Sequence, residues 1–207
     1  MSSTDRSLPP DRTTVSAVIV AGGLGRRMSA DGSGVDKGLL QLRGRAMVAH
    51  VIERIASQVS TVIINADPSS ASWQSFGLPV IADIIEGRLG PLAGIHAAMK
   101  HVQTPWLLAV PCDTPALPHD LLPRLARAQQ RTQADRVCAR TAGQLHPATL
   151  LVRSELEPSL RIYLEQGGRK IETWLEAGAW AQADFEDEQA FLNVNTPQQL
   201  QQLEQNA

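Results

Sequence analysis

Short apolar runs alternate with amphipathic stretches along most of the chain. Apolar runs that predict strands lie at residues 15–21, 61–66, 79–82 and 106–110. Stretches with the spacing of an amphipathic helix separate or follow them at residues 47–59, 93–102 and 119–130. The first run, VSAVIVA, is apolar throughout, as in a strand buried on both faces of a parallel sheet. The alternation predicts right-handed crossovers and a Rossmann-like, three-layer α/β/α fold with a predominantly parallel sheet.

The second half of the chain departs from this alternation. Residues 136–140 and 148–153 flank a polar turn that contains Gly143, which predicts two strands joined by a hairpin-like connection. We therefore expect a mixed sheet. Two further helices are expected at residues 154–166 and 170–177, with Gly167 and Gly168 as the break between them.

The end of the sequence, FLNVNTPQQLQQLEQ, predicts a strand followed by a helix. Thr196 is a favoured N-cap residue, and Pro197 suits the first helical position, where its missing N–H would have no intrahelical partner. Asn193 and Asn195 alternate along the expected strand and would share one of its faces.

Composition supports one globular unit. Hydrophobic residues make up 43% of the 207 residues and charged residues 19%, which excludes the low hydrophobicity of disordered chains. Residues 1–14 are polar, lack periodicity and contain two adjacent prolines, so we expect a disordered leader there. Residues 15–207 are expected to form a single domain, which their number permits.

Charge and cysteine content narrow the class of protein. Nineteen Lys and Arg against 21 Asp and Glu give a net charge of −2, which argues against a surface built for nucleic acid. No apolar run reaches the roughly 20 residues of a membrane span, and no signal-peptide pattern opens the chain. Cys112 and Cys138 form no CxxC pair, so neither a disulfide framework nor a zinc site is indicated. We expect a cytoplasmic protein.

A glycine-rich segment follows the first predicted strand. Six of the 15 glycines lie in GGLGRRMSADGSGVDKG, from Gly22 to Gly38. Backbone N–H groups of such a turn can bind phosphate oxygens, and Arg26, Arg27 and Lys37 add positive charge. The alternative is a flexible surface loop with solvated charges.

Two familiar phosphate-binding loops do not fit this segment. A Walker loop needs Ser or Thr after its lysine, whereas Gly38 follows Lys37. The dinucleotide-binding fingerprint needs a third glycine where Met28 stands. The segment therefore indicates another kind of phosphate site.

Polar residues end three of the predicted strands. Asn65, Asp83 and Asp113 stand where ligands bind in open α/β sheets, at the carboxyl ends of the strands. A carboxylate there suits a Mg²⁺ ion bound to substrate phosphates, which favours Asp113 as a metal ligand. The alternatives are a helix N-cap for Asp113 and a turn residue for Asn65.

Four motifs occur in order along residues 16–203. They are VAGG with the following Gly25, Arg27-Met28 and Asp36-Lys37-Gly38; GPLAG at 90–94; PCDTP at 111–115; and NVNTP at 193–197. With these motifs the chain resembles the molybdenum cofactor guanylyltransferases, a family with a nucleotidyltransferase fold. One departure is the segment SADGSGV before Asp36, which is about four residues longer than the usual loop of that family.

The resemblance implies an enzyme that transfers GMP from GTP to the terminal phosphate of molybdenum-molybdopterin, with release of pyrophosphate. It implies a nucleotide-binding N-terminal half and a molybdopterin-binding C-terminal half. Lys37, Arg27 and a Mg²⁺ ion on Asp113 would act on the phosphates. The implied GTP-binding residues are Val20, Ala21, Gly22, Gly23, Lys37, Asn65, Asp83 and Asp113.

The acceptor side is assigned by resemblance to Asn193 and Asn195, with turn and capping chemistry as the alternative. For His146, a structural or solvent-exposed histidine is favoured over a catalytic one because no paired ligand accompanies it. Gly22-Gly23 and the GPLAGI segment favour guanine over cytosine, again by resemblance. The implied partners are molybdenum-insertion proteins and molybdoenzymes or their chaperones, contacted transiently by a monomer.

Two rival functions remain compatible with the sequence. The first is another nucleotidyltransferase of the same fold, acting with CTP or on a sugar phosphate. The second is a non-catalytic carrier of GTP or of the cofactor. Lys37 and Asp113 together argue against a carrier, because a protein that only binds needs no such phosphate-transfer pair.

Overall fold

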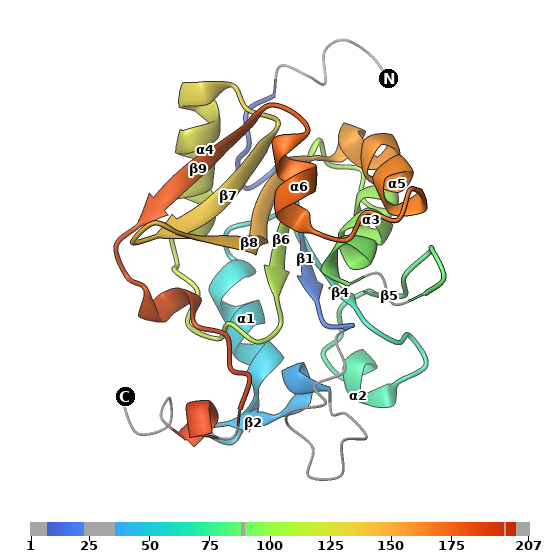
Figure 1. Cartoon of the computed structure of the whole chain (residues 1–207). Coiled ribbons are helices and arrows are strands. Elements are labelled where there is room, and N and C mark those ends of the chain that lie inside the picture. The colour runs from blue at the N-terminus through green and yellow to red at the C-terminus, as the bar shows by residue number, and fades with distance from the viewer. Residues whose placement is uncertain (1–7, 23–35, 88–89, 197, 202–207) are drawn as a thin grey trace.

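A seven-stranded mixed sheet forms the centre of the computed structural model, which describes residues 8–22, 36–87, 90–196 and 198–201. The strand order is β5-β4-β1-β6-β8-β7-β9 (Figure 1). The strands are β1 (Val15–Val20), β4 (Thr61–Asn65), β5 (Val80–Ile81), β6 (Trp106–Pro111), β7 (Arg136–Thr141), β8 (Gln144–Arg153) and β9 (Trp180–Phe185). A separate ribbon pairs β2 (Gln41–Leu42) with β3 (Arg45–Ala46).

The parallel half of the sheet follows the predicted strands. β1 lies between β4 and β6 and is parallel to both, and β5 is parallel to β4. Alternate residues of β1 enter different hydrophobic clusters: Ala17 and Ile19 on one face, Val18 on the other. A continuous apolar run therefore forms a strand buried on both faces, as predicted.

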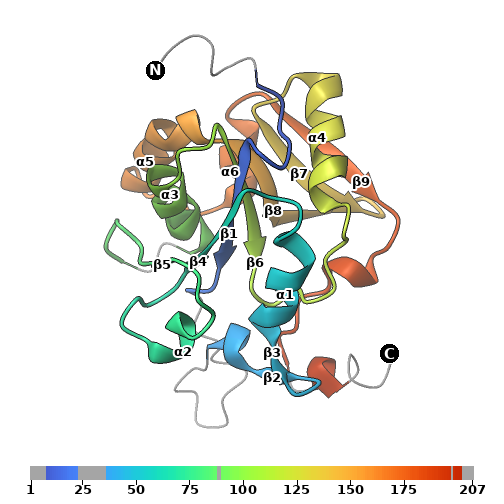
Figure 2. The same ribbon diagram turned by 180° about the vertical axis from the view of Figure 1, so that it is seen from behind.

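Helices cover both faces of the sheet. Helices α1 and α4 pack on one face, and α3, α5 and α6 pack on the other (Figure 1, Figure 2). The predicted three-layer architecture is confirmed. The helices are η3 (Lys37–Leu39), α1 (Met47–Ile55), α2 (Ala71–Gln74), α3 (Pro91–His101), α4 (Leu121–Thr132), η4 (Ser154–Leu156), α5 (Glu157–Glu165), α6 (Ile171–Glu176) and η5 (Gln189–Phe191).

The predicted hairpin joins β7 to β8. Ala142 and Gly143 both have positive φ, 43° and 84°, as in the tight turns whose twist matches antiparallel strands. β8 is antiparallel to β6 as well as to β7, so the sheet is mixed. The edge strand β9, parallel to β7, was not expected from the sequence.

Two expectations near the ends of the chain differ from the structure. No strand forms at residues 191–195, because no strand edge pairs with this segment, and it runs as irregular chain after η5. Residues 8–14, expected to be disordered, include an ordered turn in which Thr13 and Thr14 donate to the Asp11 carboxylate. The Trp106 indole also donates to the carbonyl oxygen of Leu8, at 3.0 Å.

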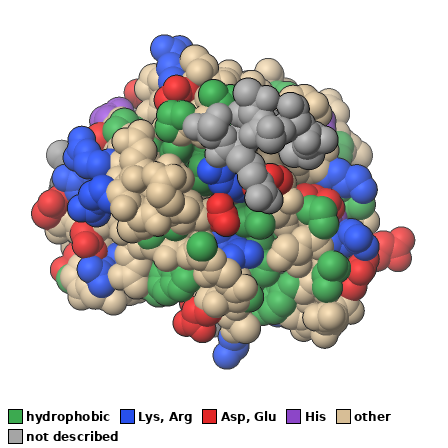
Figure 3. Space-filling model, turned by 90° about the horizontal axis from the view of Figure 1, so that it is seen from above, with side chains coloured by type: hydrophobic (Ala, Val, Ile, Leu, Met, Phe, Trp, Pro, Cys, Tyr) green, Lys and Arg blue, Asp and Glu red, His purple; other side chains and the backbone are tan. Residues whose placement is uncertain are grey.

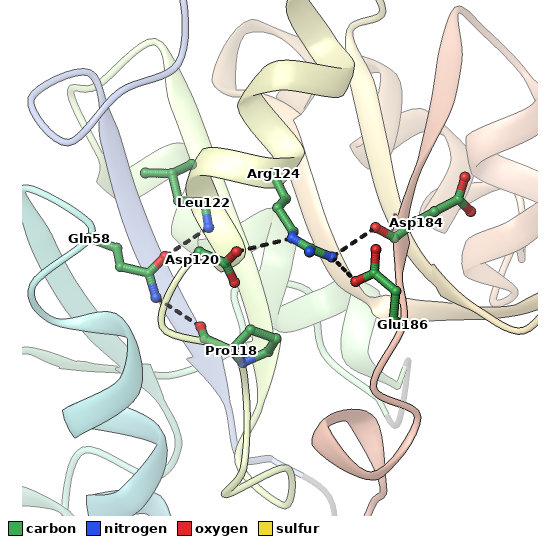
Figure 4. Close-up of polar contacts among 7 residues, drawn as sticks. All are labelled: Gln58, Pro118, Asp120, Leu122, Arg124, Asp184 and Glu186. Atoms are coloured by element: carbon green, nitrogen blue, oxygen red, sulfur yellow. Dashed lines mark hydrogen bonds and ion pairs between the residues drawn. The ribbon is translucent and has the colours of Figure 1, made fainter.

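Two polar side chains fix the connection between β6 and α4 (Figure 4). Buried Gln58 donates to the Pro118 carbonyl at 3.1 Å and accepts from the Leu122 N–H at 2.8 Å, so it serves as a cap from outside the helix. Arg124 bonds the carboxylates of Asp120 at 3.0 Å and Glu186 at 2.7 Å, which ties α4 to the end of β9. The loop after β6 therefore has support from both sides.

The surface around the amino ends of the parallel strands carries charges of both signs. Figure 3 shows basic and acidic side chains interspersed with apolar and neutral ones on this face. Within the described part of the chain, no helix is long and apolar enough to cross a membrane.

Candidate functional site

Several of the predicted site residues meet at the carboxyl ends of β1, β4 and β6. These ends lie side by side because the three strands are parallel and in register, with Val20 opposite both Asn65 and Pro111. Beyond β1, the Ala21 N–H donates to the Asn65 carbonyl at 2.9 Å. Gly22 continues this edge, as expected for the start of a ligand-binding turn.

Lys37 and Asp113 form an ion pair at this edge. The Lys37 ammonium lies 3.3 Å from Oδ2 of Asp113 and also donates to the amide oxygen of Asn195. The two charged side chains are 21% and 11% exposed, so the pair is mostly out of water. Burial raises the pKa of Asp113 above its usual value, while the Lys37 charge opposes the shift.

Lys37 is placed by the tight packing of its neighbour Gly38. A Cβ at Gly38 would lie 2.7 Å from the Trp73 ring and 3.1 Å from Cβ of Cys112, so only glycine fits between them. The Trp73 indole donates to Asp36 at 3.2 Å, which holds the same turn from the other side. Burial raises the pKa of the Cys112 thiol to about 12, so this cysteine contributes packing rather than acid–base chemistry.

Asp113 does not cap a helix. Helix α4 begins at Leu121 with Asp120 as its N-cap residue, so the capping alternative for Asp113 is wrong. The Asp113 carbonyl accepts the Val194 N–H at 2.9 Å, which fixes the backbone next to the carboxylate. The carboxylate itself accepts from Lys37.

Asn65 and Asp83 interact with each other. The Asn65 amide, only 2% exposed, donates to the Asp83 carboxylate at 3.0 Å and to the Ile81 carbonyl at 3.3 Å. Helix α3 contacts Asn65 through Gly94, where any side chain would overlap the amide. Asn65 is therefore a buried bridge between strands, not a turn residue.

The two predicted acceptor residues do not share a strand face. Asn193 is exposed, whereas Asn195 is half-buried and bonds Lys37. A capping box holds the turn that follows: Gln199 N–H donates to Thr196 Oγ1, and Oε1 of Gln199 accepts the Thr196 N–H. The predicted N-cap role of Thr196 is confirmed, and Asn195 lies on the Lys37 side of the site.

Comparison with known proteins identifies the family. The model of the MobA-like NTP transferase domain matches residues 17–182. A molybdenum cofactor guanylyltransferase from Shewanella sp. (strain MR-4) is 44% identical over 91% of this chain and 94% of the relative. The chain belongs to this family of transferases. A second member, from Shewanella piezotolerans, is 41% identical over 92% of both chains.

Solved structures agree with the fold of the family. Molybdopterin-guanine dinucleotide biosynthesis protein A from Archaeoglobus fulgidus superposes with a TM-score of 0.73 at 23% identity, covering 92% of this chain and 97% of that one. A nucleotidyl transferase from Methanothermobacter has the same TM-score at 18% identity, covering 93% and 96%. At these identities the likeness shows the fold alone.

The remaining predicted residues fall into two groups. Gly23, Arg26 and Arg27 lie outside the described residues. His146 lies 2.6 Å from Thr141 Oγ1 and stacks on the Phe191 ring, with 4.7 Å between ring centroids. Burial lowers the pKa of His146, so its imidazole is neutral near pH 7, as suits a packed structural histidine.

The donor set fits a metal ion shared with substrate phosphates. Among the described residues, no three His, Cys, Asp or Glu side chains gather closely enough to form a protein-only metal site. Mg²⁺ in phosphate-transfer sites is commonly bound through one or two carboxylates and the phosphates themselves. The mostly buried carboxylate of Asp113 matches that pattern.

Sequence reasoning missed three residues that shape the site. Trp73 lies in a helix that the sequence did not predict, and the contact of Asn195 with Lys37 was not expected from the sequence. Gly94 was noted only within a motif. A glycine inside a helical pattern is the signal that could have revealed its close contact with Asn65.

Proposed function

We propose that this protein transfers GMP from GTP to the terminal phosphate of molybdenum-molybdopterin, forming molybdopterin guanine dinucleotide and pyrophosphate. Family membership supports the reaction. The observation that carries the proposal is the mostly buried Lys37–Asp113 pair at the carboxyl ends of parallel strands, where α/β proteins bind nucleotides.

The nucleotide occupies the edge formed by β1, β4 and α3 in this proposal. Val20, Ala21 and Gly22 present backbone to it, and Asn65 and Asp83 supply polar groups beside them. Gly23, which lies outside the described residues, is assigned to the same site. The Asn65 oxygen faces Gly22 and Gly94, so its orientation is restricted by the backbone around it.

Asp113 would hold Mg²⁺ together with the triphosphate. When bound, the ion neutralises phosphate charge, which is a large part of the barrier to an attack by one anion on another. Lys37 lies beside Asp113 and adds a second positive charge at the same end of the nucleotide. Arg27 is assigned a similar role, by resemblance to the family.

The reaction needs alignment more than acid–base catalysis. An oxygen of the terminal phosphate of molybdopterin attacks the α-phosphorus of GTP, and the bond from that phosphorus to the pyrophosphate oxygen breaks. The attacking phosphate is already ionised near neutral pH, so no general base is required. Lys37 stabilises the negative charge that moves onto the departing pyrophosphate.

Pyrophosphate release provides the test. The protein with Mg²⁺ and molybdopterin should release pyrophosphate from GTP and much more slowly from CTP or ATP. Asp113→Ala should abolish release while the thermal unfolding curve stays cooperative. Preference for CTP would indicate the cytidylyltransferase alternative. Tight GTP binding without pyrophosphate release would indicate a carrier, and near wild-type turnover of Asp113→Ala would remove the metal assignment.

We further propose the cellular setting implied by this reaction. The protein acts in the cytoplasm as a monomer and passes its product to molybdenum-insertion proteins, molybdoenzymes or their chaperones by transient contact. Size-exclusion chromatography with light scattering tests the monomer. Cross-linking in cell extracts tests the contacts, and absence of any cross-link to a molybdoenzyme or its chaperone would contradict them.

A further inference from the structure

The Lys37 ammonium has two acceptors that come from distant parts of the chain. One is the Asp113 carboxylate, 76 residues away, and the other is the side-chain oxygen of Asn195, 158 residues away. An ammonium has three N–H donors. Two are used by these contacts, and the third has no acceptor among the described residues.

Asn195 is itself held in place from both sides. Its backbone N–H donates to Oε1 of Gln199 at 2.7 Å, and the Thr196 N–H donates to the same oxygen at 3.1 Å. On its other side, the Val194 N–H donates to the Asp113 carbonyl at 2.9 Å. The backbone at Asn195 is therefore held close to Asp113.

We propose that Asn195 is a positioning residue for Lys37. Its amide oxygen and the Asp113 carboxylate fix two donors of the ammonium and leave the third directed to the triphosphate. The inference rests on the proposed function, because it takes Lys37 to contact the nucleotide. It moves Asn195 from the acceptor side, where resemblance placed it, to the phosphate end of the GTP site.

The chemistry of the amide suits this role. A lysine side chain has many rotamers, and holding it in advance lowers the entropic cost of binding a ligand. A second carboxylate would also hold Lys37, but it would leave two negative charges beside one positive charge and repel a triphosphate. A neutral oxygen orients the ammonium without placing a second negative charge beside it.

Binding of GTP without acceptor isolates this effect from the pterin. Calorimetry with GTP and Mg²⁺ should show about three- to ten-fold weaker binding for Asn195→Ala, the range expected when one flexible side chain must be ordered on binding. Gln198→Ala is the matched control, because Gln198 is an exposed amide in the same segment and has no assigned role in the site. It should leave GTP affinity within about two-fold of wild type, well below the range for a lost positioning contact.

A double-mutant cycle with Lys37→Ala tests whether Asn195 acts through the lysine. In that background, Asn195→Ala should cause no further loss of GTP affinity. Gln199→Ala, which loosens the turn that holds Asn195, should weaken binding in the same direction by a smaller factor. Thermal unfolding of each variant shows that the fold persists.

Three results would overturn the inference. The first is wild-type GTP affinity in Asn195→Ala. The second is a loss of GTP affinity on adding Asn195→Ala to Lys37→Ala that is as large as the loss in the wild-type background. The third is an effect of Asn195→Ala confined to the KM of the acceptor. Failure of the wild-type protein to bind GTP would instead refute the proposed function, and this inference with it. The two failures are therefore distinguished by the wild-type titration alone.

Discussion

Gly94 gives the sharpest test of how α3 packs against the strand ends. At a solvent-exposed position inside a helix, replacing glycine by alanine stabilises the protein by about 1 kcal/mol. In α3, however, a methyl group at position 94 would overlap the amide of Asn65. Helix propensity and packing therefore predict effects of opposite sign, and we predict that Gly94→Ala destabilises the protein.

The magnitude follows from the contacts of Asn65. Forcing a methyl group into a packed site costs about 1–3 kcal/mol. If the amide rotates away, it loses its bonds to Ile81 and Asp83, each worth about 0.5–1.5 kcal/mol. After subtraction of the gain in helix propensity, the free energy of unfolding should fall by about 1–5 kcal/mol.

Guanidinium chloride unfolding of four proteins measures this effect. They are wild type, Gly94→Ala, Asn65→Ala and the double variant. In the Asn65→Ala background the overlap is gone, so the same Gly94→Ala change should be neutral or stabilising. Gly94→Ala as stable as wild type, or equal losses in both backgrounds, would refute the reasoning.

Three further predictions concern stability, pH and thiol reactivity. Gln58→Ala should lower the free energy of unfolding by about 1–3 kcal/mol, because it leaves a buried N–H of α4 without an acceptor, whereas exposed Gln130→Ala should have little effect in the same denaturant titration. Burial lowers the pKa of His146, so part of the stability present above pH 6.5 should be lost as the pH falls below it; His146→Gln should reduce that slope, and an unchanged slope would contradict the assignment. Burial raises the pKa of Cys112 and of Cys138 to about 12, so both thiols should react with a disulfide reagent at pH 8 far more slowly in the native protein than in the unfolded one, and equal rates would contradict their burial.

The parallel half of the fold could be predicted because its strands are apolar throughout. β1 and β6 are buried on both faces, so an unbroken apolar run in the sequence directly indicates each strand. β9 could not be predicted in this way. Its sequence, WAQADF, has only two fully buried residues and no β-branched side chain, and it becomes a strand by pairing with β7 at the sheet edge.

The strand predicted at residues 191–195 is wrong for a related reason. Phe191 and Val194 are buried while Leu192 and Asn193 are exposed, a spacing that follows contacts with the protein body rather than a pleated strand. Lys37 and Asp113 could be picked out by residue type and motif. Their contact with Asn195 could not, because a contact across 158 residues depends on how the whole sheet folds.

The contacts that place the site residues are independent of the ion pair they form. Gly38 is wedged between Trp73 and Cys112, and the Asp113 carbonyl is bonded by the Val194 N–H. A backbone held only by the Lys37–Asp113 ion pair would lose its order whenever a ligand weakened that pair. Because packing and main-chain bonds hold the backbone instead, its position does not depend on the charges of the pair. Charge-removing substitutions at the pair should therefore affect ligand binding more than folding, whereas enlarging Gly38 should affect both.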